Sequence, residues 1–87
     1  MNVKLTGHAV QRLNRVRVSV GACKKLVRAS IEAGTASETR PVWYTGGEDA
    51  PGTLYAPLTD RAVAVCGKKA GTLFVITVVN VKKQRAA

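Results

Sequence analysis

The chain has 87 residues, of which 46% are hydrophobic, so we expect one small domain with one core. Its 14 Lys and Arg side chains outnumber its 5 Asp and Glu side chains, which gives a formal net charge of +9. Dense apolar runs at 62–66 and 73–79 exclude a disordered chain. No run approaches the ~20 apolar residues of a membrane-spanning helix, and the first residues lack the features of a secretory signal. We therefore expect a cytoplasmic protein.

Positive charge is concentrated at the two ends of the chain. Residues 1–31 contain seven bases and no acid, whereas residues 32–60 contain five acids and one base. Residues 61–87 contain six bases and no acid. A cationic surface built from both ends attracts phosphate backbones or an acidic protein face. The distribution therefore predicts a nucleic acid or an acidic protein as partner, and no membrane.

The first third of the chain has the pattern of two helices. Thr6 is a candidate N-cap for the first helix, and the alternating residues that follow Asn14 interrupt the helical pattern. Ser19 is a candidate N-cap for a second helix of about fourteen residues, which Gly34 ends. The outer side of this second helix carries three bases, Lys24, Lys25 and Arg28.

Strand patterns follow in the rest of the chain. The clearest strands are 61–66 and 72–81, joined by a hairpin turn at 67–71, and their continuous apolar character predicts central positions. We also predict a β-prone segment at 41–45, a loop at 46–52 and a short strand at 53–56. Residues 82–87 are predicted to form a frayed basic tail. The predicted fold is a single α+β domain over 1–87, with two N-terminal helices followed by a three- to four-stranded antiparallel sheet.

The two cysteines predict neither a metal centre nor a redox motif. Cys23 and Cys66 lie far apart in the sequence, and a single histidine cannot complete a four-ligand zinc site without carboxylates. We expect two buried free thiols, with a disulfide only in an exported protein. No glycine pattern matches a nucleotide-binding loop, so we expect no cofactor.

The single histidine has basic neighbours at helical spacing. His8, Arg12 and Arg15 fall at i, i+4 and i+7, which places an imidazole and two guanidinium groups on one stripe of the first helix. Imidazole gives or takes a proton near neutral pH, and guanidinium groups bind phosphate and stabilise its developing charge. These groups suit metal-independent RNA cleavage by attack of a 2′-hydroxyl. They equally suit a phosphate-binding surface without catalysis, or a solvent-facing stripe.

Two further residues have both a functional and a structural interpretation. Thr77 interrupts an apolar strand, and period-two alternation predicts that it shares a face with Leu73, Val75, Val79 and Val81. It is either a hydroxyl directed at a bound phosphate or a β-branched residue that fills the strand. Tyr55 is either an RNA-stacking ring or a core anchor.

Several of these segments together resemble the small RelE-like domains of the barnase, EndoU, colicin and RelE nuclease grouping. The similar segments are 5–13, 54–58, 61–66 and 72–78. These domains occur in toxin–antitoxin systems, phages and polymorphic toxins. The resemblance implies that His8, Arg12 and Thr77 are active-site residues. The family pattern has a further arginine two turns after the histidine; here Val16 stands at that place, with Arg15 and Arg17 beside it as substitutes.

Three functions are consistent with these features. The first is a growth-inhibiting, metal-independent endoribonuclease that an acidic antitoxin neutralises. In this function, the RNA- and phosphate-binding side chains of the chain are Arg15, Arg17, Lys24, Lys25, Arg28 and Tyr55. The second is a non-enzymatic, phage-encoded inhibitor that docks its cationic face on an acidic host protein. The third is a plain nucleic-acid-binding module, whose affinity falls steeply with salt.

Overall fold

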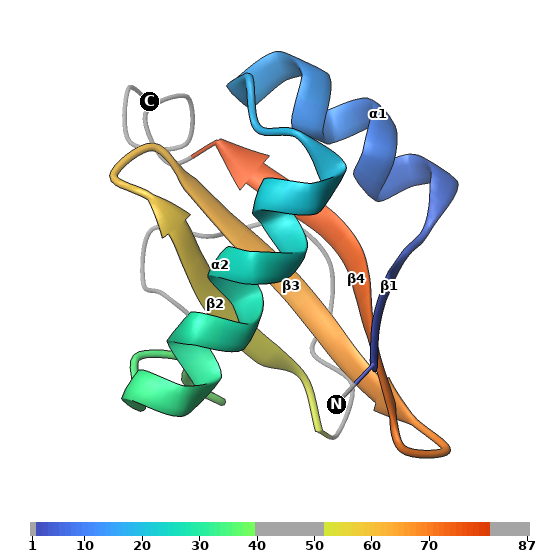
Figure 1. The fold of residues 1–87 in the computed structure, drawn as a ribbon, viewed down its shortest axis with the longest axis vertical. Coiled ribbons are helices and arrows are strands. Elements are labelled where there is room, and N and C mark those ends of the chain that lie inside the picture. Colours follow the sequence, from blue (N-terminus) through green and yellow to red (C-terminus); the bar gives the residue numbers. More distant parts are fainter. Residues whose placement is uncertain (1, 40–51, 81–87) are drawn as a thin grey trace.

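The computed structural model describes residues 2–39 and 52–80. Within these ranges, two helices lie over one face of a four-stranded sheet (Figure 1). In chain order the elements are β1 (Asn2–Leu5), α1 (Gly7–Val16), α2 (Val20–Ala33), β2 (Leu54–Thr59), β3 (Ala62–Lys69) and β4 (Thr72–Asn80). The α+β class is confirmed. The predictions at 41–45 and 82–87, and most of the loop at 46–52, lie outside the described residues.

The sheet is mixed, so the prediction of a purely antiparallel sheet was wrong. Its strand order is β1-β4-β3-β2, and β1 pairs in parallel with β4, from Asn2 opposite Thr72 to Leu5 opposite Val75. The other neighbouring pairs are antiparallel, and β3 and β4 occupy the predicted central positions. Strand β1 was missed because four residues are too few for a period-two pattern to stand out, although Val3 is buried between two exposed neighbours.

The helix boundaries follow from capping chemistry. The Thr6 hydroxyl accepts a hydrogen bond from the N–H of Ala9, and the Ser19 hydroxyl accepts one from the N–H of Ala22, each over 3.1 Å. Gly34, at φ 74°, ends α2 in the left-handed conformation that glycine adopts without strain. Both predicted N-caps and the predicted C-cap are confirmed. Neither described helix is long and apolar enough to cross a membrane.

One helix end and one turn place non-glycine residues in the left-handed region. Arg17, at φ 56°, ends α1 and donates its backbone N–H to the carbonyl of Leu13. Ala70, at φ 50°, and Gly71, at φ 77°, form the tight turn between β3 and β4. The hairpin turn is therefore shorter than the predicted 67–71, because β3 continues to Lys69.

The main core lies between the helices and the sheet. Its largest fully buried side chains come from both helices and the two central strands: Leu13, Cys23, Val27, Cys66, Leu73 and Val75. Both thiols are free, as predicted. Burial, and to a lesser extent the nearby Cys23, raises the pKa of Cys66 to about 12. Burial also raises the pKa of Cys23. Neither thiol is poised as a nucleophile.

A smaller cluster lies on the sheet face away from the helices. It contains Tyr55, Val65 and Val79. On this face β4 is irregular, because Val65 pairs with Thr77 whereas Cys66 pairs with Val75, which leaves Ile76 as the extra residue of a β-bulge. The bulge changes which β4 side chains face the helices beyond this point.

Candidate active site

Thr6 connects the start of α1 to the bulge of β4 through two hydrogen bonds. Its backbone N–H donates to the carbonyl of Val75 over 3.1 Å, and its hydroxyl donates to the carbonyl of Ile76 over 2.8 Å. The same hydroxyl accepts from the N–H of Ala9 as the N-cap. The first turn of α1 therefore has a fixed position on the sheet.

His8 and Arg12 meet on this anchored helix. Arg12 Nε donates a hydrogen bond to His8 Nε2 over 3.4 Å. Because Nε2 accepts this bond, the ring proton of a neutral imidazole resides on Nδ1. His8 is exposed and Arg12 is partly buried. The spacing of four residues, which predicted that the two side chains share a helix face, brings imidazole and guanidinium into contact.

The charge around this pair is suited to an anion. No acidic residue lies in the first turn of α1, where the helix dipole is positive. Among the described residues, no carboxylate forms an ion pair with Arg12, so its Nη groups remain available to a ligand. No group of three or more His, Cys, Asp or Glu side chains in the described ranges is arranged to hold a metal ion.

The two other arginines of this region lie farther along the helix. Arg15 is exposed in the last turn of α1, about 10 Å along the axis from His8. Arg17 follows at the C-cap. The structure therefore joins His8 to Arg12, while Arg15 and Arg17 lie in the last turn and at the end of α1.

Thr77 is not joined to this pair. It pairs with Val65, so its side chain lies on the sheet face away from the helices. The predicted face shared with Leu73 and Val75 was wrong, because the bulge at Ile76 reverses the alternation. In the described part of the chain, no hydrogen bond links Thr77 to His8 or Arg12.

Tyr55 is a core residue in the described structure. Its side chain is only 3% exposed and packs with Val65 and Val79. Its backbone N–H and carbonyl pair with Ser37, over 2.7 and 3.0 Å. A ring that stacks on RNA bases must be accessible, so this burial favours the interpretation of Tyr55 as an anchor.

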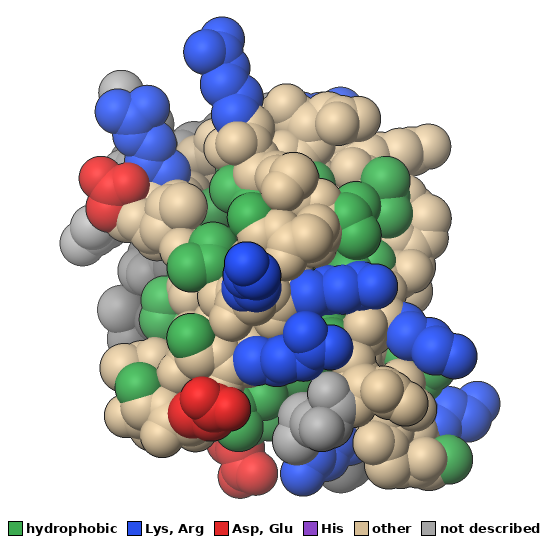
Figure 2. All heavy atoms as spheres, viewed as in Figure 1, with side chains coloured by type: hydrophobic (Ala, Val, Ile, Leu, Met, Phe, Trp, Pro, Cys, Tyr) green, Lys and Arg blue, Asp and Glu red, His purple; other side chains and the backbone are tan. Residues whose placement is uncertain are grey.

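The bases of α2 lie on another surface than His8. Lys25 and Arg28 are exposed and Lys24 is partly exposed, on the outer side of the helix as predicted. Figure 2 shows basic side chains gathered over α2 and toward β1, and the chain's only histidine is not visible in that view. These bases therefore form a surface apart from the His8–Arg12 pair.

Sequence reasoning missed two features of the site. The bond from Thr6 to Ile76 spans 70 positions, and no local pattern indicates such a contact. Lys4 and Lys69 join the basic surface only through strand pairing that includes the missed β1. The alternation of exposed and buried residues in β1 was the one available signal.

The arrangement of two helices on one face of a four-stranded mixed sheet agrees with the RelE-like fold that the sequence resemblance implied. The chain is similar to two crystal structures of YafQ from E. coli. For YafQ from strain BL21(DE3) the TM-score is 0.53 at 8% sequence identity, with 91% of each chain covered. For a histidine-to-glutamine mutant of YafQ the TM-score is 0.52 at 10% identity, with the same coverage. No family model and no curated protein matches the chain.

Proposed function

We propose that this chain is a toxin that acts on RNA, as a metal-independent endoribonuclease. The observation that carries the proposal is the hydrogen-bonded His8–Arg12 pair on the anchored first turn of α1. The fold shared with YafQ supports a toxin acting on RNA, as does the sequence resemblance to the RelE nuclease grouping.

In the proposed reaction, His8 is the general base. Arg12 releases Nε2 of the imidazole when it turns to the phosphate, and Nε2 then takes the proton from a 2′-hydroxyl. The 2′-oxygen forms a bond to the adjacent phosphorus while the bond from phosphorus to the 5′-oxygen breaks. The leaving 5′-oxygen takes a proton from water. The products are a 2′,3′-cyclic phosphate and a 5′-hydroxyl end, and no metal or redox partner is needed for this balance.

Arg12 supports this reaction in two ways. Before RNA binds, its Nε orients the imidazole through the hydrogen bond to Nε2. Once RNA is bound, its guanidinium group contacts the non-bridging oxygens of the phosphate, where negative charge increases in the transition state. Arg15 and Arg17 bind neighbouring phosphates. Thr77 has no step in this scheme, because its side chain faces away from the helices.

An acidic antitoxin is the expected neutralising partner. A chain with a net charge of +9 attracts acidic protein surfaces as well as RNA. An antitoxin that covers the first turn of α1 would block access to the His8–Arg12 pair. Such a complex would weaken as salt concentration rises.

The test combines cleavage in vitro with growth in a bacterial host. Purified wild-type protein is incubated with end-labelled RNA in EDTA, beside the variants His8→Ala and Arg12→Ala. The exposed Asn14→Ala, on the same helix, is the matched control. We expect cyclic-phosphate products from wild type and the control, and a roughly 10²–10⁴-fold slower rate for His8→Ala. Each protein is also expressed in cells, where growth and RNA integrity are followed together.

The same test separates the alternatives. Growth arrest with intact RNA, unchanged by His8→Ala, would overturn the nuclease proposal and favour an inhibitor of an acidic host protein. RNA binding without cleavage would overturn it in favour of a plain binding module.

A further inference from the structure

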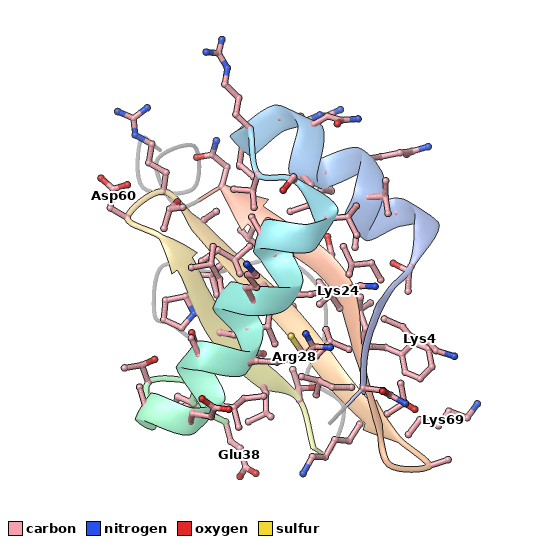
Figure 3. All side chains as sticks on the ribbon, viewed as in Figure 1. Lys4, Lys24, Arg28, Glu38, Asp60 and Lys69 are labelled. Atoms are coloured by element: carbon pink, nitrogen blue, oxygen red, sulfur yellow. The ribbon has the colours of Figure 1, made fainter. Side chains whose placement is uncertain are left out.

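Both cysteines of the chain lie in the interface between α2 and the sheet. Cys23 lies on the inward side of α2, one turn before the buried Val27, and Cys66 lies on β3 opposite Val75. All four side chains are 0% exposed and belong to the main core. Figure 3 shows a cysteine sulfur, drawn in yellow, beside α2 and in front of β3. Both thiols are free, and the proposed RNA cleavage uses neither.

The contacts of α2 place this helix across the two central strands. Helix α2 contacts β2 and β1, the outer strands of the sheet, so it crosses over β3 and β4 between them (Figure 1). Near the end of α2, the Ser30 hydroxyl donates to the carbonyl of Pro57 on β2 over 3.0 Å. Cys23 lies two turns earlier, about 10 Å along the helix axis. Since neighbouring strands are about 4.8 Å apart, this length is enough to bring Cys23 from β2 to β3.

Small side chains on the sheet allow α2 to approach it closely. Ala56, Ala62 and Ala64 are at most 1% exposed, and Ala56 pairs with Ala64 on the face that carries Cys66. A layer of alanines lets the helix backbone come nearer to the strands than a layer of leucines would. A disulfide needs this closeness, because its two Cα atoms lie within about 7 Å of each other.

The two thiols also influence each other electrostatically. The pKa of Cys66 is raised to about 12, first by burial and then by Cys23. A charge on one sulfur disfavours a charge on the other only over a short distance. This influence agrees with a position of Cys23 over β3.

We propose that Cys23 and Cys66 form a reversible intramolecular disulfide that locks α2 onto β3 under oxidising conditions. In a reducing compartment the thiols stay free, and noncovalent contacts alone hold α2 on the sheet. Oxidation closes a loop of roughly 40 residues, which restricts the unfolded chain and thereby stabilises the fold. The proposal does not rest on the proposed nuclease activity, because His8 and Arg12 lie on α1.

The oxidant is a small-molecule disulfide such as glutathione disulfide. The thiolate of one cysteine attacks a sulfur of the oxidant, which forms a mixed disulfide and releases one glutathione thiolate. The thiolate of the other cysteine attacks the protein sulfur of the mixed disulfide, which forms the bond between Cys23 and Cys66 and releases the second glutathione. The protein loses two protons and two electrons, and the oxidant takes up both.

Burial makes this reaction slow in the folded, reduced protein. The pKa of each thiol is raised, so few thiolates form, and the surrounding core excludes the oxidant. Oxidation therefore proceeds when α2 moves away from the sheet, or while the chain folds. We expect sub-denaturing urea to accelerate it.

The experiment refolds the whole chain from urea in a glutathione redox buffer and compares it with the same protein kept in dithiothreitol. Mass spectrometry after alkylation counts the free thiols, and a peptide map identifies the linked cysteines. We expect the oxidised protein to take up no alkyl label and to contain a link between Cys23 and Cys66 within one chain. The urea midpoint should rise by roughly 1–3 M relative to the reduced protein, and should return when dithiothreitol is added.

Two single-cysteine variants are the matched controls. Cys23→Ala and Cys66→Ala cannot form the link, so the oxidising buffer should leave the urea midpoint of each unchanged. Wild type alone gives the decisive comparison, so a variant that fails to fold does not affect the result. A link only between chains, a mixed disulfide with glutathione as the end product, or a lower urea midpoint after oxidation would overturn the proposal. RNA cleavage does not enter these measurements, so they are independent of the test of the proposed nuclease.

Discussion

The hydroxyl of Thr6 donates to the carbonyl of Ile76 and at the same time accepts from the N–H of Ala9. One side chain thereby caps α1 and ties its first turn to the bulge of β4. Two residues after Thr6, His8 begins the candidate active site, so the position of the imidazole depends on this link.

We expect Thr6→Val to lower the free energy of unfolding by about 1–2 kcal/mol, because it removes the cap and the link while keeping the side-chain volume. Urea denaturation followed by circular dichroism measures the loss. Thr6→Ser keeps the hydroxyl and should stay near wild type. Equal stability of the valine and serine variants would contradict the role of the hydroxyl.

Removal of the Arg12 guanidinium should change the protonation pattern of the His8 ring. In the structure Nε2 accepts from Arg12, so the proton of the neutral ring is on Nδ1. In Arg12→Ala, Nε2 is free to carry the proton, and we expect the ring ¹⁵N shifts at alkaline pH to move accordingly. Arg15→Gln, with the same loss of charge, should leave the shifts unchanged. Identical spectra for wild type and Arg12→Ala would argue against the hydrogen bond.

Arg17→Gly should stabilise the protein by roughly 0.5–1 kcal/mol. Arg17 has φ 56°, a conformation that strains side-chain-bearing residues and that glycine adopts freely. The opposite sign is expected for Arg15→Gly, because Arg15 lies within α1, where glycine costs about 1 kcal/mol. The comparison uses urea midpoints of two variants that each lose one positive charge, and destabilisation by both would refute the prediction for Arg17.

Stability should fall in alkaline solution through the buried thiols. Burial raises the pKa of Cys66 from 9.0 to about 12, so the fold favours the neutral thiol. The contribution of Cys66 to stability is fully present below about pH 9 and is lost as the pH rises toward 12, with a slope of at most about 1.4 kcal/mol per pH unit.

Cys66→Ala tests this prediction through the pH slope and not through absolute stability, which the cavity lowers at every pH. We expect a shallower fall between pH 9 and 12 than in wild type, measured by urea denaturation at each pH. Parallel curves for the two proteins would show that other groups cause the alkaline loss.

Local signals predicted the helices well and the sheet less well. Thr6, Ser19 and Gly34 act within one turn of chain, so their capping roles were evident from the sequence. The parallel pairing of β1 with β4 was not evident from the sequence, because a pair as distant as Asn2 and Thr72 produces no local pattern.

In the candidate site, too, local features were predicted and long-range features were not. The spacing of four residues between His8 and Arg12 predicted that they share a helix face, and there they form a hydrogen bond. Thr77 was assigned to the wrong face of the sheet because one extra residue, Ile76, shifts the alternation of side chains along β4. No residue type in β4 indicates a bulge at this position. The sequence around Tyr55 is consistent with either a buried or an exposed ring. Only the packing of the ring with Val65 and Val79 shows that it is buried.

The parallel pairing of β1 with β4 also orders events during synthesis on the ribosome. Asn2–Leu5 is made before its partner strand Thr72–Asn80, which follows some 70 positions later. A nascent chain that lacks β4 has no acceptor for the Thr6 hydroxyl and no sheet edge for β1. Because such non-local pairing is slow to form, the fold closes only once β4 has emerged. The proposed nuclease would in this way stay inactive while it is still being translated.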